Sequence, residues 1–271
     1  MLSITAGTSC FDRAGKRLVS IERDGISVLD LKTHEARRFP LRGVRSIAAF
    51  DDQWWAVTEA NYLVRMDYDG RRMSGAWLEM AHDGVLIAST VGCASCAWTC
   101  EIPVVITDDR GWVTAKTVVA DLALPLDGDR NVLVRGRRMV MPGRSRGELA
   151  PSTDVLGGTV ANDGASVVLL VAHGKATSVI VVSVESGTTV QRFAMPSREI
   201  RVAPREMIAI ARVDRRTLGA WDLATGIELE RHTFAHAVTD FAVDPAGSVL
   251  AVRTDAGIEL VDRRNARRIA A

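Results

Sequence analysis

A tight turn recurs along this chain at nearly constant spacing. In most copies an Asp or Ser is followed, three or four residues later, by Gly or by a residue in its place. Tightly joined antiparallel strands need a residue that tolerates positive φ, and the preceding Asp can hydrogen-bond the turn's own backbone. The markers, 36, 41, 36, 40, 39 and 39 residues apart, are His34, Gly70, Gly111, Gly147, Gly187, Gly226 and Asn265.

Short apolar strands with alternating patterning precede these turns, for example RLVSIE from Arg17 and SVLAVR from Ser248. No segment has the pattern of a long amphipathic helix. Short strands that repeat near 40 residues predict four-stranded antiparallel blades around a channel. We therefore expect an all-β chain that folds as a single seven-bladed β-propeller.

The expected blades are residues 1–41, 42–80, 81–121, 122–156, 157–196, 197–234 and 235–271. Blade four is expected to be irregular, because Met141–Asp154 is rich in Pro, Gly, Ser and Arg. Two ways of closing the ring are open. The final strand, Arg267–Ala271, can complete blade seven, or Met1–Thr5 can supply its outer strand.

The last two repeats resemble a known family. Trp221-Asp222 lies where WD40 repeats carry their Trp-Asp pair, and Thr239–Ser248 resembles the first WD40 strand and its turn. The Gly-His pair of WD40 repeats is absent, so the chain is similar to degenerate, WD40-like bacterial propellers. That resemblance implies a subunit of a multiprotein system, one candidate being a system with a MoxR-type ATPase and a von Willebrand A protein.

Composition narrows the class of partner. Charged residues make up 25% of the chain and the net charge is only +1, so no strong field attracts nucleic acid or an anionic membrane. The N-terminal sequence does not read as a signal peptide, and the apolar runs are too short for a membrane span. The four cysteines are then expected to be reduced thiols of a cytoplasmic protein.

Three cysteines cluster in VGCASCAWTCE: Cys93, Cys96 and Cys100. A C-x2-C spacing can bind zinc or an iron–sulfur cluster, but the second half of such a motif is missing. We expect Ser95–Glu101 to be the second strand of blade three, with these residues as core cysteines. A metal site and a redox disulfide remain the alternatives, and no cofactor is predicted.

No other pattern predicts catalysis. The five histidines form no recognisable ligand pair, and both the nucleophile elbow and the P-loop are absent. The adjacent acids Asp51–Asp52 and Asp108–Asp109 are typical of turns, although paired carboxylates also serve glycosidases. Trp54 and Trp55 must face opposite ways on a strand, so we expect one to pack within the blades while the other reaches the surface or the next blade.

Arginine is concentrated in the loops that join second to third strands and in those that join blades. In a propeller these loops share one face. Because Arg is enriched at protein interfaces and binds carboxylates through two parallel hydrogen bonds, we expect this face to dock an acidic or mixed-charge partner protein. The predicted partner-binding residues are Arg23, Arg42, Arg137, Arg138, Lys175, Arg198, Arg215 and Arg216.

The leading hypothesis is a non-catalytic interaction scaffold, because a fold alone supplies no activity. A hydrolase or lactonase with its site at the channel mouth is the first alternative. It would need carboxylates, histidines or a metal converging there from several blades. A sensor of small ligands or glycans is the second alternative.

Overall fold

The computed structural model describes residues 9–50, 52–60, 62–77, 86–89, 92–95, 102–107, 113–118, 122–127, 130–135, 137–141, 146–149, 153–161, 164–265 and 267–269. These residues form seven four-stranded sheets. The all-β prediction is confirmed.

The first four sheets span the N-terminal half of the chain. Sheet one is β1 (Ser9–Phe11), β2 (Arg17–Glu22), β3 (Gly25–Asp30) and β4 (Ala36–Phe39). Sheet two is β5 (Val44–Ala49), β6 (Gln53–Thr58), β7 (Tyr62–Asp67) and β8 (Arg72–Trp77). Sheet three is β9 (Leu86–Ser89), β10 (Gly92–Ser95), β11 (Ile102–Thr107) and β12 (Val113–Val118). Sheet four is β13 (Leu122–Asp127), β14 (Arg130–Arg135), β15 (Arg138–Val140) and β16 (Arg146–Glu148).

The other three sheets form the C-terminal half. Sheet five is β17 (Asp154–Ala161), β18 (Ser166–His173), β19 (Ala176–Ser183) and β20 (Thr189–Ala194). Sheet six is β21 (Ile200–Ala203), β22 (Ile208–Arg212), β23 (Thr217–Asp222) and β24 (Glu228–Thr233). Sheet seven is β25 (Val238–Val243), β26 (Val249–Thr254), β27 (Gly257–Asp262) and β28 (Arg267–Ile269).

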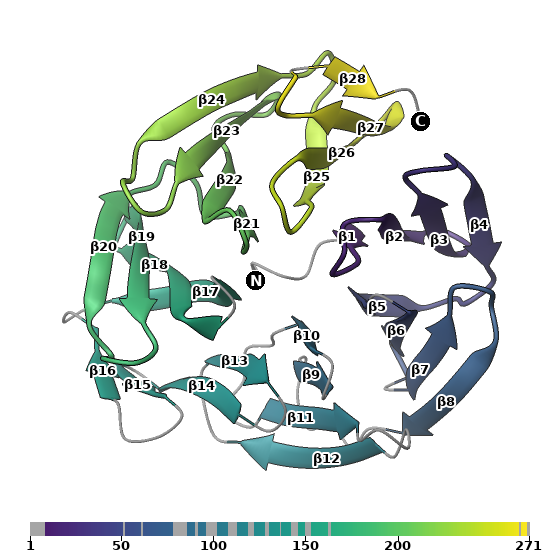
Figure 1. Ribbon diagram of the computed structural model, residues 1–271, viewed down its shortest axis with the longest axis horizontal. Coiled ribbons are helices and arrows are strands. Elements are labelled where there is room, and N and C mark those ends of the chain that lie inside the picture. The colour runs from purple at the N-terminus through teal and green to yellow at the C-terminus, as the bar shows by residue number, and fades with distance from the viewer. Residues whose placement is uncertain are drawn as a thin grey trace.

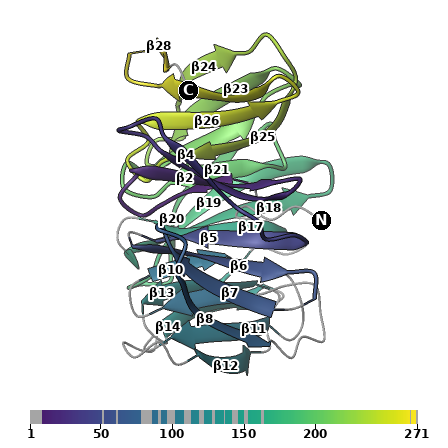
Figure 2. The same ribbon diagram turned by 90° about the vertical axis from the view of Figure 1, so that its right-hand side faces the viewer.

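The sheets stand around a common centre, as Figure 1 shows, and Figure 2 shows the same arrangement from the side. Each innermost strand contacts the innermost strand of the next sheet, and β25 of sheet seven contacts β1 of sheet one. This is the arrangement of a β-propeller, and it places the turns between strands on two opposite faces.

The repeated turn has the predicted conformation at four of its markers. His34, Gly70, Gly187 and Gly226 have φ of 61°, 88°, 72° and 74°. At three of them the marker's N–H donates to the carbonyl oxygen four residues earlier, for example Gly226 to Asp222 at 2.8 Å. The left-handed region is strained for a residue with a Cβ, and this explains the preference for Gly.

The Asp that opens the turn also has the predicted role. Asp30 Oδ1 accepts hydrogen bonds from the backbone N–H of Lys32 (2.9 Å) and Thr33 (3.0 Å). The bonds from Thr33 and Lys32 hold the pKa of the Asp30 carboxyl below its usual value. Asp222 Oδ1 accepts in the same way from Thr225 N at 2.7 Å.

The marker assignment is wrong at Gly147, which lies in strand β16 opposite Met139 and not in a turn. Asn265 acts through its side chain instead, since its Nδ2 donates to Asp262 Oδ2 at 2.8 Å. Gly111 lies outside the described residues.

The irregular sheet is the third and not the fourth. Sheet four is a consecutive antiparallel meander from β13 to β16. Sheet three has the strand order β10-β9-β11-β12, and β9 pairs with β11 in parallel. The expectation of antiparallel strands throughout is therefore wrong for sheet three, and β10 occupies the innermost place there. The boundary expected at residues 156/157 is also shifted, because β17 already begins at Asp154.

Large side chains fill the spaces between neighbouring sheets. Trp54 and Trp55 are both fully buried, Trp54 against Phe39 and Trp55 against Phe50, with ring centroids 5.4 and 5.2 Å apart. The prediction that one Trp could reach the surface is not realised. Both tryptophans serve packing.

Two turn glycines also allow the preceding sheet to approach. A Cβ on Gly226 would lie 2.8 Å from the Phe193 ring of sheet five, and a Cβ on Gly70 would lie 2.9 Å from the Phe39 ring of sheet one. One residue type thus meets two needs, a positive φ and a close contact between sheets.

The ring joins between sheets seven and one through side chains. Five buried apolar residues meet there, three of them large: Phe11, Leu18, Ala242, Ala251 and Leu260. Strand β28 pairs with β27, so the C-terminal segment supplies the outer strand of sheet seven. Met1–Thr5 lies outside the described residues. Among the described residues, no helix is long and apolar enough to cross a membrane.

Candidate functional site

Strand direction brings the predicted loops to one face. In a four-stranded meander, the turn from second to third strand and the connection to the next sheet lie at the same end. We call the face formed by these turns and connections the arginine face. It includes the β2–β3, β18–β19 and β22–β23 turns and the connections β4–β5 and β20–β21.

All eight predicted partner-binding residues are exposed at these loops. Arg137 lies in the β14–β15 turn and Arg138 begins β15, while the others occupy the turns and connections named above. One of these side chains is fixed across two sheets: Arg198 Nη2 donates to the carbonyl oxygen of Gly174 at 3.2 Å.

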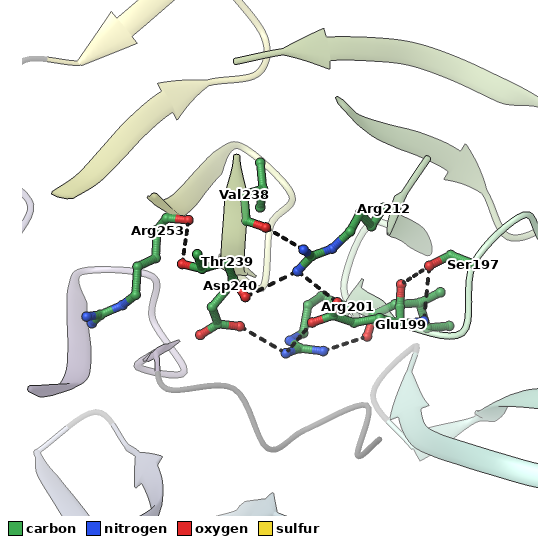
Figure 3. A network of polar contacts seen from close by, with 9 residues as sticks. Ser197, Glu199, Arg201, Arg212, Val238, Thr239, Asp240 and Arg253 are labelled. Carbon is green, nitrogen blue, oxygen red and sulfur yellow. Dashed lines mark hydrogen bonds and ion pairs between the residues drawn. The ribbon is translucent and has the colours of Figure 1, made fainter. Parts of the chain in front are cut away.

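A second set of arginines lies deeper, at the inner rim of the same face (Figure 3). Arg201 on β21 is 8% exposed. Its Nη2 lies 3.2 Å from Asp240 Oδ1 of sheet seven and 3.4 Å from Glu199 Oε1. Its guanidinium lies over the Phe241 ring, 5.1 Å from the centroid. A buried charge is tolerated because it is paired and hydrogen-bonded.

Arg212 extends this network from the end of β22. Its Nη2 lies 2.9 Å from Glu199 Oε2 and donates to the Thr239 carbonyl oxygen at 3.2 Å. Its Nη1 donates to the carbonyl oxygen of Val238. Arg212 therefore joins the β20–β21 connection to the first residues of sheet seven.

Arg253 makes the corresponding link between sheets seven and one. It lies at the end of β26, and its Nη2 donates to Glu22 Oε1 at 3.0 Å and to the Ile21 carbonyl oxygen at 3.3 Å. Thr239 Oγ1 donates to the carbonyl oxygen of Arg253 at 3.1 Å, so the network is continuous over three sheets.

The network is balanced in charge. Three guanidinium groups, Arg201, Arg212 and Arg253, face the carboxylates of Glu22, Glu199 and Asp240. Each guanidinium is paired with a carboxylate, although the Nε atoms of Arg212 and Arg253 are buried without a hydrogen-bond partner among the described residues. The loop before β21 is fixed as well, since Ser197 Oγ accepts from Glu199 N at 3.0 Å. The inner rim is therefore a framework and leaves little excess charge for a ligand.

Sequence reasoning missed these inner residues, although a signal was present. Arg201 and Asp240 occupy innermost strands of neighbouring repeats, 39 residues apart, and Arg212 and Arg253 each lie at the C-terminal end of a second strand. Opposite charges at equivalent positions of adjacent repeats meet around the channel.

One cysteine of the cluster is described: Cys93 lies on β10, the innermost strand of sheet three. Of the expected second strand Ser95–Glu101, the structure describes only Ser95, which ends β10. Cys96 and Cys100 lie outside the described residues. Within the described part of the chain, no group of three His, Cys, Asp or Glu residues is placed to hold a metal ion. Cys10 on β1 is a free thiol, and burial raises its pKa to about 12, which keeps it protonated and unreactive.

Three histidines make polar contacts. Arg192 Nη2 lies 2.8 Å from His173 Nε2, so this ring nitrogen accepts the bond. His232 Nε2 lies 3.5 Å from Glu230, and His236 Nδ1 lies 3.3 Å from Asp255. His34 occupies its turn. His82, Asp51, Asp108 and Asp109 lie outside the described residues.

Among the cavities lined by described residues, two lie beside the sheets named above. One, of about 230 Å³, opens between sheets one and two on the side away from the arginine face, where Arg17 lies over the Tyr68 ring at 4.3 Å and Arg37 pairs with Asp69 at 2.8 Å. The other, of about 170 Å³, lies in the channel wall between β1, β17, β21 and β25 and includes Cys10 and Arg201. In the first cavity, Arg17 and Arg37 are already bound to the sheets themselves.

Comparison with known proteins supports the fold. No family model and no curated protein sequence matches the chain. Among solved structures, the chain is similar to Hsv2 of Kluyveromyces lactis, with a TM-score of 0.65, 9% identity and 96% of each chain covered. It is also similar to the Dos1 propeller, with a TM-score of 0.60, 10% identity and 98% of this chain and 84% of that chain covered. An oligogalacturonate lyase in complex with manganese has a TM-score of 0.64 and 12% identity, with coverage of 93% and 87%. At these identities the similarity shows the β-propeller fold alone.

Proposed function

We propose that this chain is a non-catalytic scaffold or adaptor, a WD40-like, seven-bladed propeller that docks partner proteins on its arginine face. In this proposal it is a cytoplasmic subunit of a bacterial complex. A system with a MoxR-type ATPase and a von Willebrand A protein is one such setting. A rigid disc with independently variable loops suits that role.

One observation carries the proposal: the cations of the arginine face fall into two sets. Arg201, Arg212 and Arg253 at the inner rim are bound to carboxylates of neighbouring sheets. The outer cations Arg215 and Arg216 are exposed, and no carboxylate of the described residues forms an ion pair with them. Exposed Arg on a fixed frame is the kind of side chain that contributes most at protein interfaces.

The rival interpretation, a hydrolase with a channel-mouth site, needs carboxylates free to act on a substrate. Glu199 and Asp240 lie at that mouth, and both are bound to Arg201. Metal analysis of the purified protein separates the two readings. The scaffold proposal expects no stoichiometric metal, and one bound metal ion per chain would favour a metal-dependent enzyme or a metal site at the cysteines.

Co-purification from the source cells tests the proposal. The variant carries Arg137, Arg138, Arg215 and Arg216 changed to Glu. The matched control carries Lys32, Arg71, Arg205 and Arg264 changed to Glu, four exposed cations on the opposite face with the same change in charge. We expect partners to be lost from the first variant and kept by the control. Unchanged recovery with the first variant would contradict the proposal.

A further inference from the structure

Four exposed cations lie on neighbouring loops of sheets five and six on the arginine face, and we treat them as one strip: Lys175, Arg198, Arg215 and Arg216. The strip follows from contacts between the loops. Arg198 bonds the turn that contains Lys175, through Gly174 O at 3.2 Å. The next residue, Glu199, bonds Arg212 at 2.9 Å, and Arg212 leads directly into the turn that carries Arg215 and Arg216.

The charge of this strip is not neutralised within the described part of the molecule. All four side chains are exposed, and none of them forms an ion pair with a described carboxylate. Besides Glu199, which is bound by Arg201 and Arg212, two described carboxylates lie on the arginine face of sheets five and six. Asp214 accepts the Arg216 backbone N–H at 2.8 Å and is thereby engaged in its own turn, and Asp154 is exposed at the start of β17.

The backbone beneath the strip is held in place. Met195 N donates to the Thr177 carbonyl oxygen at 3.0 Å, and Glu199 N donates to Ser197 Oγ at 3.0 Å. The carbonyl oxygens of Arg215 and Arg216 each accept a backbone N–H from the connection to sheet seven at 2.8 Å. A ligand would therefore not need to order these loops, which lowers the entropic cost of binding.

We infer that this strip, which we call the cationic strip, binds a carboxylate-rich peptide segment of the partner. The inference rests on the proposed function and names the partner's chemistry. The guanidinium fork matches a carboxylate with two parallel hydrogen bonds. Separate carboxylates on a flexible segment can contact the four cations and avoid Asp154 and Asp214. A continuous phosphate backbone or a flat anionic membrane would meet those two acids as well, and a net charge of +1 gives neither surface a long-range attraction.

Binding of a synthetic peptide tests this inference. The probe is a fluorescein-labelled peptide of alternating Glu and Gly, and the control peptide has Gln in place of Glu. Anisotropy titrations at low salt are expected to show binding of the Glu peptide only, weakening as salt is raised. Arg198→Glu/Arg215→Glu/Arg216→Glu is expected to lower the affinity by about tenfold or more.

A matched variant distinguishes an effect of the strip itself from an effect of the protein's total charge. Lys32→Glu/Arg71→Glu/Arg264→Glu makes the same change in net charge on the opposite face and is expected to change the affinity by less than about twofold. Circular dichroism and thermal unfolding confirm that both triple variants are folded. An equal loss in both variants would overturn the inference, because the binding would then be nonspecific.

Two further outcomes also overturn it. One is no binding of the Glu peptide at low salt. The other is tighter binding, lost in the strip variant, of phosphatidylserine vesicles or of a single-stranded oligonucleotide. In either case the co-purification experiment still decides the proposed function, since a partner lost from the variant with Arg137, Arg138, Arg215 and Arg216 changed to Glu would dock on the arginine face through other chemistry.

Discussion

The arginine face places the same side chain in two different settings. At its inner rim Arg201, Arg212 and Arg253 contact carboxylates and carbonyl oxygens of the next sheet. On the loops a few residues away, Arg215 and Arg216 extend into solvent. Strand position makes the difference, because an Arg on an innermost strand or at the end of a second strand meets the neighbouring sheet, whereas an Arg in a turn does not.

This difference implies a division of roles. If either member of a buried ion pair is removed, the other member is left as an uncompensated charge in a region of low dielectric constant. Removing an exposed guanidinium costs little stability, because its contacts are weak and solvated. We therefore expect inner substitutions to affect stability and outer substitutions to affect binding.

The largest effect on stability is expected at Arg201. Arg201→Ala removes the ion pair with Asp240, whose side chain is 10% exposed, and the contact of the guanidinium with the Phe241 ring. The free energy of unfolding should fall by about 3–4 kcal/mol. Arg198→Ala, three residues earlier and exposed, is the control and should change it by less than about 0.5 kcal/mol. Equal effects in urea unfolding would remove the distinction between the two sets.

Two glycines allow a second comparison, between a residue packed against the neighbouring sheet and a residue exposed on the arginine face. Gly226 and Gly174 both have positive φ, 74° and 61°, but a Cβ at Gly226 meets Phe193 whereas a Cβ at Gly174 meets nothing within 4 Å. Gly174→Ala should cost about 1 kcal/mol for the left-handed backbone. Gly226→Ala should cost about 3 kcal/mol, because the overlap adds to the strain. If the two variants unfold at the same denaturant concentration, contact between sheets is not what selects Gly226.

The stability of the interface between sheets seven and one should depend on Arg253. Among the described residues, five buried apolar side chains meet there, against eleven in the cluster between sheets six and seven. Arg253→Ala removes the bonds to Glu22 and Ile21, but both charged side chains are partly exposed, at 23% and 38%. A loss of about 1 kcal/mol is expected, with faster amide hydrogen exchange in β1, β2 and β26 than in β22. Uniform exchange across all seven sheets would show that the join is no weaker than the other interfaces.

The smallest effect on stability is expected for the outer cations. Arg215→Gln/Arg216→Gln should change the free energy of unfolding by less than about 0.5 kcal/mol, because both side chains are exposed. Thermal unfolding by calorimetry measures this directly. A drop as large as that of Arg201→Ala would place these arginines in the framework.

The sequence predicts the repeated part of this fold well. The turn chemistry is local, so Asp30, Gly187 and Gly226 could be assigned from spacing and residue type. The exposed loop arginines follow from the same repeat, since turns lie outside the packed sheets.

What could not be predicted depends on contacts between distant strands. The parallel pairing of β9 with β11 places β10 before β9 in the strand order, and no turn residue in the sequence indicates this exchange. Gly147 resembles a turn marker in sequence, but the short β15 and β16 pair places it within a strand beside Gly187. The Arg201–Asp240 contact required knowing that equivalent positions of adjacent repeats lie side by side around the channel.

The most direct test of the division of roles measures stability and binding on the same two variants. For Arg215→Glu/Arg216→Glu, we predict an unchanged free energy of unfolding and the loss of the co-purified partner. For Arg201→Ala, we predict a fall of about 3–4 kcal/mol in the free energy of unfolding. The division of roles is wrong if the outer variant keeps its partner or unfolds as readily as Arg201→Ala.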